Sequence, residues 1–215
     1  MRIFLDTADL ESIRRAADTG LLDGVTTNPS KIAAAGRPYR ALFRDICSVV
    51  RGPVSVEAVA ATAEGLVRNA VEIAGLAPNI VVKVPVTPEG LKAARILETE
   101  RGVKVNVTMV FAADQACLAM KTGATYVSVV LSRLDATSMD SLLLVEDAMT
   151  IKRRYGFTSA VLAASLKTRM HVLGCLRLGC DVVTIPESLF FQMYQHPLTE
   201  QGLAEFERDW ARVQP

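Results

Sequence analysis

One lysine lies at the centre of an otherwise apolar stretch, IVVKVPV at residues 80–86. Burial disfavours the charged form of a lysine and lowers its pKa, by up to ~3–5 units when burial is complete. A neutral amine attacks ketones and forms a Schiff base, which draws electrons from the neighbouring carbon atoms. Lys83 is therefore a candidate nucleophile. Two other interpretations stay open: a cation paired with Asp6 or Glu57, and a ligand for phosphate.

Schiff-base chemistry also needs groups that move protons, and polar residues interrupt the other β-branched runs of the chain. Side chains alternate between the two faces of a strand, so each run divides into an inward and an outward set. The polar residues expected to point inward are Asp6, Thr26, Asn28, Ser55, Glu57, Lys83, Asn106, Thr108, Ser128 and Ser165. The same alternation places Val130 inward. It places outward Met109, Val127, Val129, Leu162 and Ala164.

Eight short β-branched runs alternate with longer segments that have helical spacing. The runs are residues 2–7, 24–28, 54–59, 80–86, 103–110, 126–131, 160–165 and 182–186. Dividing the 215 residues by eight gives about 27 per unit. This fits one α/β domain over residues 1–215, a single (β/α)8 TIM barrel, because such barrels need roughly 200 residues. A doubly wound open sheet is the alternative. In a barrel, inward polar residues late in their strands meet at the C-terminal mouth, where active sites occur.

The composition argues against several classes of partner. A formal net charge of +1 gives no electrostatic reason to expect nucleic acid or an anionic membrane surface. No apolar stretch approaches the ~20 residues that span a bilayer, and MRIFLDTADLE is too acidic for a secretory signal. The four cysteines lack CxxC spacing, which predicts reduced thiols in a cytoplasmic protein. Two histidines are few for a metal site, so neither a metal nor a cofactor is expected.

The end of the chain predicts one more helix, within residues 198–212. In LTEQGLAEFERDW, residues 198–210, the side chains of Leu203, Phe206 and Trp210 share one helical face. This apolar stripe has two interpretations. The helix packs on its own barrel, or it packs on a neighbouring subunit.

Seven motifs, in order along nearly the whole chain, carry a resemblance to a known family. They are LDTAD (5–9), GVTTNPS (24–30), ATAEG (61–65), VVKVPVTPEGLKA (81–93), NVTMVF (106–111), SRLD (132–135) and LAASLKT (162–168). The chain resembles class I transaldolases, in the small subfamily that includes fructose-6-phosphate aldolases. The resemblance implies a (β/α)8 barrel with a Schiff-base lysine on the fourth strand. It also implies sugar phosphates as partners, a place in the pentose phosphate pathway and a homo-oligomer, either a pentamer or a decamer.

The resemblance assigns four catalytic roles. Lys83 matches the lysine that attacks the ketose C2 carbonyl. Asp6 matches the aspartate that takes the C4 hydroxyl proton as the C3–C4 bond breaks. Glu57 and Thr108 match the pair that holds the water used in forming and hydrolysing the imine.

The resemblance also assigns substrate contacts. Asn28 and Thr26 match the residues that position the dihydroxyacetone unit, and Ser128 falls where a contact to the C1 hydroxyl is expected. A guanidinium suits phosphate, because it donates two parallel hydrogen bonds. The residues that match the phosphate site are Arg133 and Ser165, with Lys167 as a third member.

Two activities occur in the family. A transaldolase passes dihydroxyacetone from fructose 6-phosphate or sedoheptulose 7-phosphate to an aldose phosphate, whereas a fructose-6-phosphate aldolase releases it. The aldolases carry Gln at the position of Glu57 and Tyr near Val130. Glu57 and Asn106 follow the transaldolase pattern, so transfer is predicted. Two hypotheses of other classes stay open: a non-catalytic barrel that binds sugar phosphates, and a phosphosugar isomerase or epimerase.

Two residues depart from the family pattern. Val130 replaces an aromatic residue expected beside the Schiff base, which removes ring volume and predicts an altered donor preference. Lys31 replaces a usually apolar residue in TNPSKI, and we interpret it as part of an exposed first helical turn.

Overall fold

Eight parallel strands close into a barrel in the computed structural model, which describes residues 1–213. Among these residues the strands are β1 (Arg2–Asp6), β2 (Gly24–Thr26), β3 (Val54–Glu57), β4 (Ile80–Pro85), β5 (Val105–Val110), β6 (Tyr126–Val130), β7 (Ala160–Ala164) and β8 (Val182–Ile185). They follow chain order around the barrel, and β8 pairs with β1. The prediction of a (β/α)8 barrel is confirmed, and the open sheet is wrong. The predicted domain runs to residue 215, so its last two residues lie outside the described chain.

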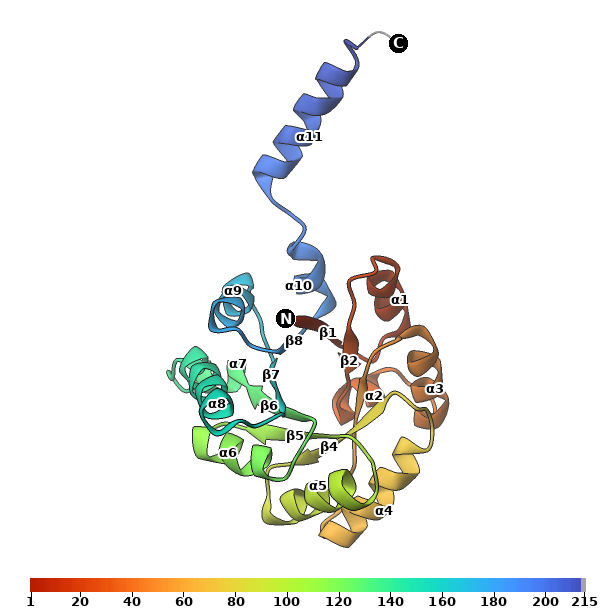
Figure 1. Ribbon diagram of the computed structural model, residues 1–215. Helices are drawn as coiled ribbons and strands as arrows, with labels where there is room; N and C mark the ends of the chain where they lie inside the picture. The colour runs from red at the N-terminus through yellow and green to blue at the C-terminus, as the bar shows by residue number, and fades with distance from the viewer. Residues whose placement is uncertain (214–215) are drawn as a thin grey trace.

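Helices surround the barrel and connect its strands (Figure 1). Within residues 1–213 they are α1 (Leu10–Asp18), α2 (Pro29–Ala34), α3 (Tyr39–Val49), α4 (Ala63–Ala74), α5 (Pro88–Glu100), α6 (Ala113–Lys121), α7 (Leu131–Asp135), α8 (Ser141–Tyr155), α9 (Arg169–Leu178), α10 (Glu187–Gln192) and α11 (Pro197–Trp210). No helix in this part of the chain combines the length and the apolar character that crossing a membrane requires.

The apolar residues of the strands serve two separate cores. Outward side chains such as Val82 and Val84 are fully buried against the helices. Inward side chains fill the lower barrel, where Phe4 meets Tyr126 edge to face at 6.0 Å between ring centroids. Because these side chains fill the interior of the barrel, a site can form only at the open C-terminal end of the barrel.

The predicted orientation of β7 is wrong. Leu162 and Ala164 point inward, in contact with the inner core, whereas Val161 and Ala163 face the helices. Every residue of AVLAA is apolar, as is common for a parallel strand covered on both faces, so the pattern could not fix its orientation. Ser165 follows the strand in a left-handed conformation (φ 63°), and this turn brings it to the mouth.

The predicted orientation of Met109 is also wrong. Its φ is 63°, and the pairing of β5 with β6 shifts register between Val107 and Val110. Such an irregularity turns a side chain away from its regular direction. Met109 therefore lies at the mouth of the barrel instead of against the helices.

A close contact between main chains fixes the helix that follows the lysine strand. Two residues separate β4 from helix α5, and the Thr87 hydroxyl accepts a hydrogen bond from the Gly90 N–H at 3.1 Å. A Cβ atom on Gly90 would lie 1.9 Å from the Pro85 carbonyl oxygen. Only glycine permits this approach, which holds α5 against the end of the strand that carries Lys83.

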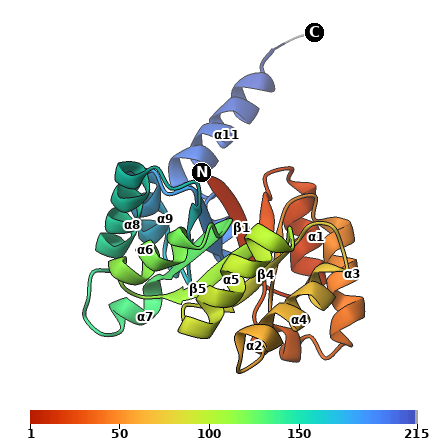
Figure 2. The same ribbon diagram turned by 60° about the horizontal axis from the view of Figure 1, so that its bottom comes forward.

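The C-terminal helix α11 projects away from the barrel in both views (Figures 1 and 2). None of its residues is buried, and the side chains of Leu203, Phe206 and Trp210 are 56%, 72% and 76% exposed. The helix is present as predicted, and within this chain it does not pack on its own barrel. Its apolar stripe is left uncovered.

Candidate active site

The C-terminal mouth of the barrel contains a cavity of about 510 Å³. Nine of the predicted site residues line it: Asp6, Thr26, Asn28, Glu57, Lys83, Thr108, Ser128, Arg133 and Ser165. They come from seven of the eight strands or the residues that directly follow them. Residues that the sequence did not place at the site also line it: Lys31, Met109, Leu162, Ala164 and Thr184. Val130, which the alternation predicted to point inward, lines it as well.

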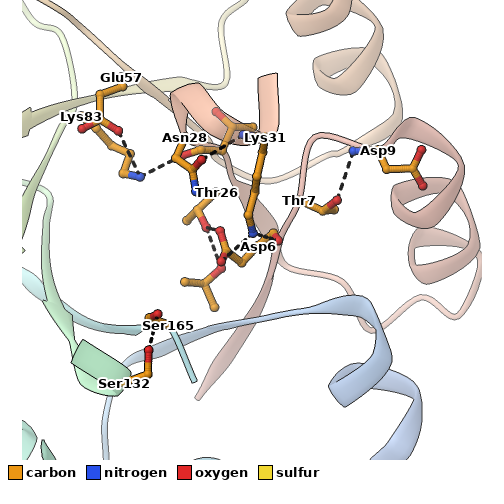
Figure 3. Close-up of polar contacts among 12 residues, drawn as sticks. Asp6, Thr7, Asp9, Thr26, Asn28, Lys31, Glu57, Lys83, Ser132 and Ser165 are labelled. Carbon is orange, nitrogen blue, oxygen red and sulfur yellow. Dashed lines mark hydrogen bonds and ion pairs between the residues drawn. The ribbon is translucent and has the colours of Figure 1, made fainter. Parts of the chain in front are cut away.

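Lys83 lies deep in this cavity, with 9% of the residue exposed. Its Nζ donates a hydrogen bond to the Thr27 carbonyl oxygen at 2.8 Å and lies 3.7 Å from Glu57 Oε2 (Figure 3). Lys83 and Glu57 are register partners on β4 and β3. The lysine is therefore secluded and oriented, and the Glu57 carboxylate lies within salt-bridge distance of its amine.

Asp6, the last residue of β1, faces the same cavity. Its Oδ1 accepts a hydrogen bond from the Thr26 hydroxyl at 3.3 Å, and the Thr26 hydroxyl lies 2.7 Å from that of Thr184. Thr184 was missed from the sequence. Its position in VVTI, two residues after inward-facing Val182, is a signal that parity could have used.

A second lysine approaches Asp6 from α2. Lys31 Nζ forms an ion pair with Asp6 Oδ2 at 2.6 Å and also donates to the Asp6 carbonyl oxygen. Its side chain is only 29% exposed. The interpretation of Lys31 as part of an exposed helical turn is therefore wrong, because its side chain lies along the wall of the cavity.

Asp9, the other carboxylate of LDTAD, has a structural role. It is the N-cap of α1, where it accepts hydrogen bonds from the Ser12 hydroxyl at 2.6 Å and the Ser12 N–H at 2.9 Å. These bonds, the hydroxyl first, hold the pKa of Asp9 below its usual value. The two carboxylates of the motif therefore have different positions: Asp6 faces the cavity, and Asp9 caps a helix.

Asn28 also begins a helix. Its side-chain oxygen accepts a hydrogen bond from the Lys31 N–H at 3.0 Å and caps α2, whose first residue is Pro29. Asn28 therefore lines the cavity and fixes the turn that carries Lys31.

A buried hydrogen-bonded chain crosses the strands beneath the lysine. The Ser128 hydroxyl donates to Asn106 Oδ1 at 2.7 Å, and Asn106 Nδ2 donates to the Ser55 hydroxyl at 3.3 Å. All three residues are at most 1% exposed. Each group depends on its neighbour for a hydrogen bond, because so little of these residues is exposed.

The opposite wall carries the predicted phosphate site. Arg133 belongs to α7, which begins where β6 ends, and Ser165 follows β7. The Ser165 hydroxyl lies 2.7 Å from that of Ser132 (Figure 3). Lys167 does not join them: it is exposed, its N–H donates to His171 Nδ1 at 3.3 Å, and it is not among the described residues that line the cavity.

Replacing Ser128 by Ala should destabilise the protein by about 1–3 kcal/mol, because Asn106 Oδ1 loses its donor in a buried place. Chemical denaturation measures this free energy of unfolding. Ser132→Ala is the matched control, since its hydroxyl bond has the same length but is only partly buried. Equal losses in the two variants would contradict the proposed dependence on burial.

Comparisons with known proteins identify the family of this chain. Residues 3–214 match the family described as "Transaldolase/Fructose-6-phosphate aldolase". A probable transaldolase of Moorella thermoacetica is 49% identical over 213 residues, which cover 99% of each chain. A probable transaldolase of Geobacter metallireducens is 46% identical over 213 residues, which again cover 99% of each chain.

Two solved structures are similar in fold alone, because each is 13% identical to this chain. An inosine 5'-monophosphate dehydrogenase from Legionella pneumophila has a TM-score of 0.61, covering 88% of this chain and 58% of its own. An orotidine 5'-monophosphate decarboxylase from Methanocaldococcus jannaschii has a TM-score of 0.59, covering 86% and 87%. Because the family model matches nearly the full length and the two probable transaldolases are 46% and 49% identical, the chain belongs to the transaldolase/fructose-6-phosphate aldolase family.

Proposed function

We propose that this protein is a transaldolase that carries a dihydroxyacetone unit on Lys83. The donor is fructose 6-phosphate or sedoheptulose 7-phosphate, the acceptor is an aldose phosphate, and the pathway is the pentose phosphate pathway. One observation carries the proposal: in a member of this family, a lysine that is 9% exposed lies 3.7 Å from a carboxylate inside the barrel mouth. The proposed reaction uses no cofactor.

Imine formation is the first step. The Lys83 amine attacks the C2 carbonyl of the ketose and forms a carbinolamine, which loses water to give the protonated imine. Glu57 donates the proton that the departing hydroxyl needs, and Thr108 helps to hold the water. Ser128 and Asn28 orient the bound hydroxyls.

Cleavage of the C3–C4 bond is the second step. Asp6 takes the C4 hydroxyl proton, the C3–C4 electron pair moves through C2 onto the nitrogen of the protonated imine to give a neutral enamine, and an aldose phosphate leaves. The enamine then attacks the aldehyde carbon of a second aldose phosphate, whose oxygen receives the proton from Asp6. Hydrolysis of the new imine frees Lys83, so every proton and electron pair is returned.

Phosphate recognition falls to Arg133 and Ser165, with Ser132 supporting the serine. Their wall is across the cavity from Asp6, which suits an extended sugar phosphate. Lys167 stays a prediction as a third member of this site, since its side chain is exposed two residues beyond Ser165.

Release of dihydroxyacetone, the aldolase reaction, is the second candidate. The family includes both activities by its description. Glu57 and Val130 favour transfer, since the aldolases are expected to have Gln and Tyr near these positions. A non-catalytic barrel or an isomerase explains the phosphate site but leaves the secluded Lys83 without a nucleophilic role.

Lys83→Met should abolish the covalent adduct, because methionine keeps the apolar stem but has no amine. The test is to incubate the protein with fructose 6-phosphate or dihydroxyacetone, add borohydride to reduce the imine, and measure the intact mass. We expect one adduct per chain, located at Lys83 by peptide mapping. Lys92→Met, at an exposed helix position, is the control and should keep the adduct. No adduct on the unaltered protein with any ketose would rule out the Schiff base.

We also propose that the whole chain, residues 1–215, is a single barrel domain that works as a cytoplasmic homo-oligomer, a pentamer or a decamer. The uncovered stripe of Leu203, Phe206 and Trp210 on α11 supports the assembly of several copies. Exposed apolar surface of this kind is typical of an interface. In the assembly, α11 would pack on a neighbouring copy.

The double variant Phe206→Glu/Trp210→Glu should therefore reduce the assembly toward the 23.2 kDa monomer, because charge in the stripe opposes burial. Light scattering coupled to size-exclusion chromatography measures the mass. Gln201→Glu, which adds charge on the opposite face of α11, is the control and should leave the mass unchanged. A monomeric mass for the unaltered protein would contradict the proposal.

A further inference from the structure

Each carboxylate at the barrel mouth has a lysine of its own. Glu57 faces Lys83, and Asp6 is bound by Lys31. This inference rests on the proposed function. We propose that Lys31 is a positioning residue, which holds the Asp6 carboxylate in the orientation that takes the C4 hydroxyl proton and later returns it.

The ammonium of Lys31 holds Asp6 at two points. It lies 2.6 Å from Oδ2 of the carboxylate and also binds the carbonyl oxygen of the same residue. The main chain and the side chain of Asp6 are thereby fixed relative to each other. Figure 3 shows the Lys31 side chain running from its helix down to Asp6.

The two oxygens of the Asp6 carboxylate are unequally occupied. Oδ2 accepts the close charged contact from Lys31, whereas Oδ1 accepts only a long bond of 3.3 Å from the Thr26 hydroxyl. The Thr26 hydroxyl has a shorter contact, 2.7 Å, with Thr184. The geometry therefore leaves Oδ1 as the oxygen that is free to take the proton.

The turn that carries Lys31 is itself held in place. Asn28 caps α2 through the Lys31 N–H at 3.0 Å, and Pro29 restricts the first residue of the helix. The path from β2 through Asn28 to Lys31 is therefore short and fixed. Because this turn is already fixed, placing the Lys31 ammonium at Asp6 costs less conformational entropy than ordering a lysine on a mobile surface segment.

The charges at the mouth favour this role over direct phosphate binding. The charged residues that line the cavity are Asp6, Lys31, Glu57, Lys83 and Arg133. Without Lys31, Asp6 has no cation within salt-bridge distance among the described residues. Of the groups suited to phosphate, Ser165 lies across the cavity in Figure 3, where it meets Ser132, and Arg133 lines the same cavity.

Lys31→Met tests the proposal. We expect kcat for transfer to fall by about 10- to 100-fold, because a misplaced catalytic group costs up to ~10²-fold. KM for the donor should stay within about twofold, since Lys31 does not hold the substrate. Borohydride trapping of dihydroxyacetone on Lys83 should be unchanged, because imine formation depends on Glu57 and Thr108. Lys31→Arg should recover much of the lost kcat.

A double variant separates action through Asp6 from any independent role. Asp6→Asn alone should lower kcat by about 10²–10⁴-fold. Adding Lys31→Met to Asp6→Asn should cause no further loss, because the carboxylate on which the lysine acts is gone.

Lys152→Met is the matched control for loss of an ion pair. Lys152 Nζ lies 2.6 Å from Asp181 Oδ2, the same distance as in the pair of Lys31 and Asp6. The side chains of Lys152 and Asp181 are 20% and 27% exposed, and those of Lys31 and Asp6 are 29% and 24% exposed. Its kcat should be unchanged even if its midpoint of thermal unfolding falls. This comparison distinguishes loss of positioning from loss of stability.

Three results would overturn the proposal. They are an unchanged kcat in Lys31→Met, an equal loss in the Asp6→Asn background, and a raised KM that disappears with non-phosphorylated substrates. The last would assign Lys31 to phosphate. Failure of the proposed function differs from all three, because the unaltered protein would then form no adduct at Lys83.

Discussion

The need to pair charges inside the barrel mouth governs this site. A closed barrel fills its lower half with apolar side chains, so charged groups at the mouth are partly removed from water and need partners. Lys83 meets this need with the Thr27 carbonyl oxygen and Glu57, and Asp6 meets it with Lys31. These contacts offset the cost of removing the charges from water, and they also fix the orientation of the charged groups. Stability and chemistry thus depend on one set of contacts.

The barrel itself spreads the chemistry around a ring. The lysine and Glu57 come from neighbouring strands β4 and β3, Asp6 comes from β1, and Arg133 and Ser165 follow β6 and β7. In the proposed mechanism, a substrate bound across the cavity has its carbonyl at Lys83, its C4 hydroxyl at Asp6 and its phosphate at Arg133. Val130 borders this path with little volume, so the ring that the family resemblance leads one to expect is missing.

The sequence was most informative where polarity and period agreed. Eight β-branched runs predicted eight strands, and in IVVKVPV the alternation placed Lys83 inward, where the structure has it. It failed where the pattern carried no contrast or the backbone departed from it. AVLAA is apolar on both faces, which reversed Leu162, and Met109 turns inward through a left-handed conformation. The contact of Lys31 with Asp6 could not be predicted, because an ion pair between a helical turn and a strand leaves no periodic signal in the sequence.

The acceptor dependence of product formation tests the central claim most directly. Fructose 6-phosphate is supplied with and without erythrose 4-phosphate, and free dihydroxyacetone and sedoheptulose 7-phosphate are measured over time. If the site retains the three-carbon unit on Lys83, sedoheptulose 7-phosphate accumulates only with the acceptor, and little dihydroxyacetone appears without it. Rapid release of free dihydroxyacetone in the absence of acceptor would contradict transfer and identify an aldolase.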